Sequence, residues 1–123
     1  MGRHLGPGLS VLRRHASFEK AWRQGVCFRS PVLLLQAYRG WEGTGPSEEI
    51  FWGVTASRRV GSAVHRNRVK RRLRSALREV LTGAGLPGYV YVVVAKREIK
   101  GYPWNQLLQR LREGIVYVHR GLL

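Results

Sequence analysis

Nine arginine and lysine residues lie between positions 58 and 78, and no acidic residue occurs among them before Glu79. They are Arg58, Arg59, Arg66, Arg68, Lys70, Arg71, Arg72, Arg74 and Arg78. Arginine is always charged, and its planar guanidinium group forms paired hydrogen bonds to phosphate oxygens. The chemistry that this cluster predicts is therefore the binding of phosphate groups, as in a nucleic acid.

Helical spacing would place most of these charges on one side of a helix. At about 100° per residue, one narrow arc contains Asn67, Arg71, Arg74 and Arg78, flanked by Arg68, Arg72 and Lys70. The opposite side contains the apolar residues Val69, Leu73, Ala76 and Val80. We call the charged side the cationic ridge. A merely solvated face would normally mix charges of both signs, so we interpret the cationic ridge as a nucleic-acid-binding face.

The charge of the whole chain supports a polyanionic partner. The 123 residues include 22 Lys and Arg against 7 Asp and Glu, a formal net charge of +15. An unpaired positive surface of this size repels itself unless a polyanion binds to it. Nucleic acid fits best, an anionic membrane surface is an alternative, and a small acidic substrate would not require so many charges.

The remaining reactive residues predict neither a metal site nor a catalytic centre in the protein. Cys27 is the one cysteine, so no disulfide is expected. His4, His15, His65 and His119 are scattered and lack partners at ligand spacing. The apolar runs are too short to span a bilayer, so we expect a soluble, cytoplasmic protein of one domain over residues 1–123.

The elements that would position the cluster follow the order α-β-β-α-β-α. After a loose arm over residues 1–10, we expect helices at 18–24 (with Ser17 as N-cap), 61–81 and from Pro103 onward, and strands at 31–38, 50–57 and 89–95. The glycine-rich segment 40–49 predicts a hairpin between the first two strands. Residues 115–118 either extend the last helix or form a short extended tail. Helices packed on one sheet give an α+β fold.

The segment from Ala56 to Arg74 resembles the signature of the bacterial ribonuclease P protein family. In that family a strand ending in Ser and two basic residues leads through Val-Gly into a helix with the triplet Arg-Asn-Arg. Here Ser57-Arg58-Arg59 and Arg66-Asn67-Arg68 match that pattern without a gap, and weaker likeness extends over nearly the whole chain.

The resemblance implies the protein subunit of a ribonucleoprotein that removes the 5′ leader from precursor tRNA. The RNA subunit would perform the hydrolysis with Mg²⁺, so no residue of the protein would be catalytic. Contacts to the catalytic RNA would come from eight residues, Arg58, Arg59, Arg66, Asn67, Arg68, Lys70, Arg71 and Arg74. The family fold also implies a mixed sheet with a left-handed β-α-β crossover, against the usual right-handed rule.

Phe18 and Trp22 lie four residues apart on the first expected helix. From the residues alone, such a pair is more often part of a core than of a binding site. The resemblance implies instead a cleft in which aromatic rings stack on the bases of the single-stranded leader. Gln36 falls at a strand position where some relatives carry an aromatic residue, so one stacking contact would be replaced by an amide.

Two other functions remain open from the sequence. A ribosomal or DNA-architectural protein would carry a similar positive charge and belong to no enzyme. A self-sufficient nuclease would cleave RNA without an RNA subunit.

Overall fold

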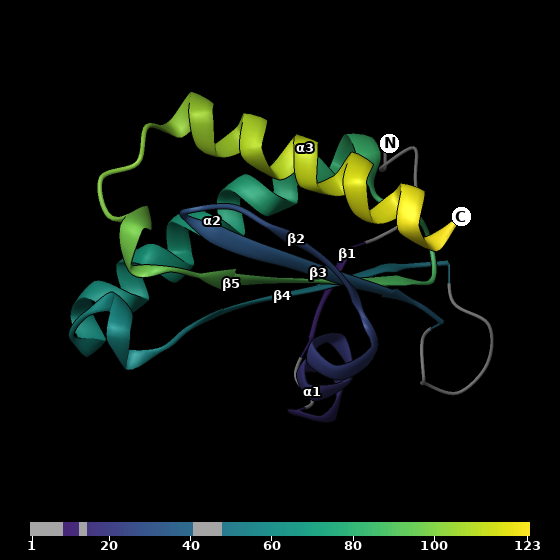
Figure 1. Ribbon diagram of the computed structural model, residues 1–123, viewed down its shortest axis with the longest axis horizontal. Coiled ribbons are helices and arrows are strands. Elements are labelled where there is room, and N and C mark those ends of the chain that lie inside the picture. Colours follow the sequence, from purple (N-terminus) through teal and green to yellow (C-terminus); the bar gives the residue numbers. More distant parts are fainter. Residues whose placement is uncertain (1–8, 13–14, 41–47) are drawn as a thin grey trace, which may run out of the picture.

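The computed structural model describes residues 9–12, 15–40 and 48–123, except the side chain of His15. A five-stranded sheet carries α1 on one face and α2 and α3 on the other (Figure 1). The strands are β1 (Leu9–Val11), β2 (Val26–Arg29), β3 (Leu33–Arg39), β4 (Ile50–Ala56) and β5 (Tyr89–Ala95). The helices are α1 (His15–Gln24), α2 (Ala63–Ala84) and α3 (Trp104–Leu122), with short 3-10 turns η1 (Arg58–Val60) and η2 (Arg97–Ile99).

The sheet is mixed, which confirms the predicted α+β class. Its strand order is β1-β4-β5-β3-β2, with β1, β4 and β5 parallel to one another and β3 antiparallel to both β5 and β2. The predicted hairpin between β3 and β4 is wrong, because β5 lies between these strands. The run Tyr89–Ala95 is apolar on both faces and therefore takes the central position, where both faces are covered.

Two edge strands were missed, because elements of three or four residues give too little alternation to detect. β2 follows α1 directly and pairs with β3. β1 pairs with β4, so the prediction of a loose arm was wrong for Leu9 and Ser10. Residues 1–8 lie outside the described residues.

Several elements begin or end a few residues away from the predicted positions, and each difference has a local reason. The strand expected from Pro31 begins at Leu33, because the Ser30 hydroxyl accepts hydrogen bonds from the Val32 and Leu33 N–H groups and forms a turn. α1 begins at His15, so Ser17 is a buried residue inside the helix and not its N-cap. α3 continues through residues 115–118, where Ile115 and Val118 are buried three residues apart.

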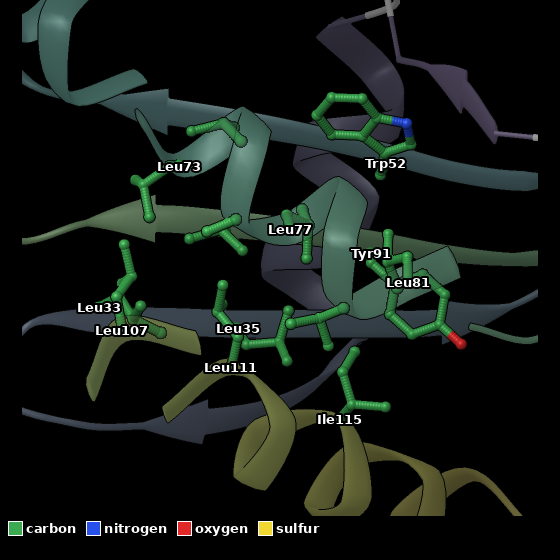
Figure 2. Packing of buried hydrophobic residues seen from close by; sticks show 14 of the residues in the cluster. Leu33, Leu35, Trp52, Leu73, Leu77, Leu81, Tyr91, Leu107, Leu111 and Ile115 are labelled. Carbon is green, nitrogen blue, oxygen red and sulfur yellow. The ribbon is translucent and has the colours of Figure 1, made fainter. Parts of the chain in front are cut away.

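The larger core lies between the sheet and the pair α2 and α3. Figure 2 shows Leu73, Leu77 and Leu81 of α2 and Leu107, Leu111 and Ile115 of α3 packed over Leu33, Leu35 and Tyr91 of the sheet. Alternate strand residues, such as Tyr38, Val90 and Val92, face α1 in a second and smaller core. The sheet therefore separates two chemically different sides of the protein.

The β4-η1-α2-β5 unit joins two neighbouring parallel strands. It is the crossover that the family resemblance implies, and its left hand stays a prediction. Ser62 caps α2 by accepting a hydrogen bond from the His65 N–H (3.4 Å), so α2 begins at Ala63 and not at residue 61 as expected. This unit places the basic segment at one end of the sheet.

Tyr91 hydrogen-bonds inside the larger core. Its hydroxyl accepts from the Leu86 N–H (3.0 Å) and lies 2.7 Å from His119 Nε2. Burial raises the pKa of Tyr91 to about 12 and lowers the pKa of His119 below its ordinary value.

The free energy of unfolding is expected to fall as the pH rises from 10 to about 12. In that range Tyr91 ionises in the unfolded chain but stays neutral in the folded protein. In Tyr91→Phe the alkaline loss should be smaller by on the order of 2 kcal/mol, although the variant is less stable near neutral pH because the Leu86 N–H loses its acceptor. Urea unfolding of both proteins across this range checks the difference, and equal alkaline losses would contradict it.

Candidate nucleic-acid interface

α2 presents the cationic ridge because its other side is fixed in the core. Val69, Leu73, Ala76, Leu77, Val80 and Leu81 are buried, as the helical spacing predicted. Asn67, Arg68, Arg71 and Arg74 are exposed, whereas Arg66 and Lys70 are half-buried. Within the described part of the chain, none of the eight residues predicted to contact RNA forms an ion pair. The positive charges of the seven basic residues among them are therefore available to phosphates.

η1 adds Arg58 and Arg59, both exposed, next to the start of α2. The Ser57 hydroxyl accepts a hydrogen bond from the Arg59 N–H (3.3 Å), and Arg66 donates one to the Gly61 carbonyl (3.4 Å). Gly61 has a backbone φ angle of 147°, which residues other than glycine rarely adopt. The turn thus brings the basic residues that follow β4 beside those of α2.

Two arginines of the cluster contact aromatic rings of the protein. Arg72 donates a hydrogen bond to the Tyr102 carbonyl, and its guanidinium lies 5.8 Å from the centre of the Trp104 ring. The guanidinium of Arg78 lies 5.6 Å from the centre of the Trp52 ring. These contacts restrain both side chains, so two of the nine positive charges of the cluster have fixed positions.

Lys96 and Arg97 extend the basic surface, and sequence reasoning missed them. They follow β5, and with Ser57 and Arg59 after β4 they line an open hollow, to which Glu98 adds one acidic side chain. The Lys96 ammonium group donates a hydrogen bond to the Ser30 carbonyl (2.7 Å), whereas Arg97 is exposed. The signal was available, because the carboxyl ends of neighbouring parallel strands meet at one edge of a sheet.

On the opposite face, the Phe18 ring lies directly on β4 at Gly53. A Cβ atom placed on Gly53 would come within 2.6 Å of Phe18 Cζ. Gly53 therefore leaves the space that the ring occupies, a role that the sequence analysis did not assign. A glycine inside an apolar strand is the signal for such a close approach.

Gln36 lies on the same face as Phe18. The register aligns Gly53, Val92 and Gln36 across β4, β5 and β3, so the backbones of Gly53 and Gln36 are about 10 Å apart. The side chain of Gln36 is only 3% exposed, so it forms part of the floor and offers little surface.

Trp22 lies one helical turn beyond Phe18 and is 65% exposed. Such exposure does not fit the core role that an aromatic pair usually has. The structure thus brings Phe18 and Gln36 to the α1 face and leaves the Trp22 ring at the surface. Their role in holding a leader stays a prediction.

Gly53→Ala is expected to lower the free energy of unfolding by about 1 kcal/mol, because the new methyl group displaces the Phe18 ring. In a Phe18→Ala background the same change should cost almost nothing, which denaturant unfolding of the four proteins in this cycle would show. Gly83→Ala is the matched control, because no atom lies within 4 Å of the added methyl group. An unchanged cost in the Phe18→Ala background would contradict the contact.

The residues that could hold a metal are few. Over the ranges that the structure describes, no three His, Cys, Asp or Glu side chains lie close enough to bind one ion. A donor set for Mg²⁺ is therefore not found there, and we assign no step through this metal to the protein. No helix in those ranges is both long and apolar enough to cross a membrane.

Comparison with known proteins identifies the family. The profile of the Ribonuclease P family matches residues 7–118. The ribonuclease P protein component of Ruegeria pomeroyi is 40% identical over 116 residues, covering 91% of this chain and 88% of that protein. The component of Paramagnetospirillum magneticum is 33% identical and covers 84% and 77%.

Solved structures share the fold. The RNase P protein of Staphylococcus aureus superposes with a TM-score of 0.69 at 20% identity, covering 87% of this chain and 93% of that one. The RNase P protein of Thermotoga maritima gives a TM-score of 0.68 at 17% identity, covering 90% and 96%. Together with the sequence matches, these likenesses show that the chain belongs to the ribonuclease P protein family, the protein components of the ribonucleoprotein endonuclease RNase P.

Proposed function

We propose that the protein binds the catalytic RNA of RNase P through the cationic ridge and the turn before it. The observation that supports this most is the set of Arg, Lys and Asn side chains on η1 and α2 that form no ion pair within the described residues. Phosphate binding by these groups releases counterions from the RNA and gives affinity that falls steeply with salt. Asn67, with an amide that donates and accepts, suits a ribose hydroxyl or a base edge.

The α1 face is proposed to hold the single-stranded 5′ leader of precursor tRNA. The exposed Trp22 ring and the half-buried Phe18 ring support this, because aromatic rings stack on bases of any sequence. Holding the leader here would favour precursor over mature tRNA. Hydrolysis is proposed to belong to the RNA subunit, which also supplies the Mg²⁺ sites, and both RNAs would be met in the cytoplasm.

Reconstitution with the catalytic RNA tests the proposal. The protein should increase the cleavage of precursor tRNA, and the increase should grow as Mg²⁺ is lowered, because fewer metal ions then screen the repulsion between phosphates. The protein without RNA should not cleave. A cleavage rate at low Mg²⁺ that is unaffected by the protein would contradict the proposal and revive the alternative of a basic protein outside an enzyme.

A further inference from the structure

A pocket lies between α2 and the segment that connects β5 to α3. Its volume is about 80 Å³ when measured by the positions open to the centre of a water molecule, and about 370 Å³ when all space free of protein atoms is counted, including open solvent at the mouth. Apolar side chains from three elements line it, namely Val69 and Leu73 of α2, Ile99 of η2 and Leu107 of α3. The inner surface therefore suits a flat apolar group better than a phosphate.

The mouth of the pocket is positively charged. Arg68, Arg72 and Lys100 line the pocket, Arg68 and Lys100 are exposed to solvent, and no lining residue is acidic. Arg72 is already held by the Tyr102 carbonyl and the Trp104 ring, so its guanidinium plane is fixed before any ligand arrives. A restrained guanidinium loses less conformational entropy when a ring stacks on it.

His65 contributes a hydrogen-bonding group to the same pocket. Its Nε2 atom is buried and has no partner among the described residues. The imidazole ring packs against Gly61, where a Cβ atom would lie 2.7 Å from His65 Cδ2. A buried nitrogen without a partner costs free energy that a ligand with a polar edge would recover.

A nucleotide combines the features that this pocket would recognise: a flat ring, polar ring edges and an attached anion. We infer that the pocket takes the unstacked base of one nucleotide of the catalytic RNA. Its ring enters toward Ile99 and Leu107, and its phosphate stays outside at Arg68 and Lys100. Proteins commonly recognise RNA through splayed bases that stack on guanidinium planes. This inference rests on the proposed function, because it takes the catalytic RNA as the partner.

Methyl NMR of the whole protein provides a direct test with adenosine 5′-monophosphate as the probe. The chain has three isoleucines, of which Ile99 lines the pocket, whereas Ile50 and Ile115 are buried in the core and serve as internal references. The nucleotide should shift the Ile99 δ1 methyl signal saturably and leave the other two in place. Ribose 5-phosphate, which lacks the base, should bind this site on the order of tenfold more weakly. Equal responses to both probes, or no shift of Ile99, would overturn the inference.

Two phenylalanine substitutions on α2 separate the pocket from the rest of the helix. Val69→Phe fills the pocket and should abolish the nucleotide-dependent shift of Ile99. Val64→Phe adds the same bulk at an exposed position outside the pocket and should leave the shift unchanged. If Val69→Phe does not fold, nuclear Overhauser contacts between adenine protons and the Ile99 methyl group of the unaltered protein decide, and their absence would overturn the inference.

Addition of the catalytic RNA distinguishes its bases from free nucleotides. Binding of the RNA should move the Ile99 signal, and excess adenosine 5′-monophosphate should then have no further effect. An RNA complex in which the free nucleotide still shifts Ile99 would overturn the assignment to the RNA. Filter retention measures separately whether the protein binds the catalytic RNA at all. If it does not, the proposed function is overturned, and this assignment with it.

Discussion

Replacing Arg66 and Arg68 together with Ala is expected to weaken assembly with the catalytic RNA by about 10- to 100-fold at roughly 0.15 M salt. Both residues lie on the first turns of α2, and within the described residues neither forms an ion pair, so the change removes two of the proposed phosphate contacts. The dependence of the logarithm of the association constant on the logarithm of salt should become shallower by roughly 2 units. Filter-binding titrations at several salt concentrations measure both quantities.

The matched control is Arg39→Ala with Arg120→Ala. It removes the same two positive charges from exposed positions on β3 and α3. Arg39 pairs with Tyr89, at the end of the sheet opposite to the start of α2, and should therefore lie away from the RNA. Equal losses in the two double variants would mean that net charge alone attracts the RNA and that the cationic ridge has no special role.

Replacing Phe18 with Ala is expected to weaken holoenzyme binding of precursor tRNA by about tenfold, with little effect on mature tRNA. The ring is half-buried on Gly53, so its loss removes a stacking surface from the α1 face. The measurement is the ratio of the two dissociation constants at fixed Mg²⁺. Phe28→Ala provides the control, because Phe28 packs against Tyr117 on the other face of the sheet (5.7 Å between ring centres).

Both phenylalanine variants should lose stability, but only Phe18→Ala should change the ratio of precursor to mature affinity. Equal losses for the two tRNAs in Phe18→Ala would assign this ring to the core. Trp22→Ala provides a second test of leader binding, because a side chain this exposed should contribute less than about 0.5 kcal/mol to the free energy of unfolding. Its effect on the leader can therefore be measured in a protein of nearly normal stability.

Long periodic elements were predictable from the sequence. The buried stripe of α2 and the apolar run of β5 each follow one clear pattern, and both elements were found where they were expected. The pairing of strands was not predictable in the same way, because β5 inserts between β3 and β4 from a position far along the chain. The turn-forming residues in 40–49 carry no information about β5, the strand that separates β3 from β4 and follows α2 in the chain.

The same division applies to the candidate site. The basic face of α2 was identified from residue spacing, because seven of the nine clustered basic residues lie on this one helix. Gly53, Arg97 and the pocket beside Ile99 were not identified, since each acquires its role from a neighbour on another element. Gln36 shows the opposite limit, because its alignment with a binding position did not reveal that its side chain is buried.

The short distance along the chain between Gly53 on β4 and Arg58 on η1 has a geometric consequence. β4 pairs with β5 from Phe51 to Ala56, and the chain runs from Gly53 under the Phe18 ring through the end of β4 to Arg58 at the start of η1. Five residues of extended chain span about 16 Å. If the leader stacks on Phe18 and the catalytic RNA binds Arg58, β4 is a spacer of fixed length between substrate and enzyme. The protein would then act as a ruler that sets which leader nucleotide it holds at a constant distance from the catalytic RNA.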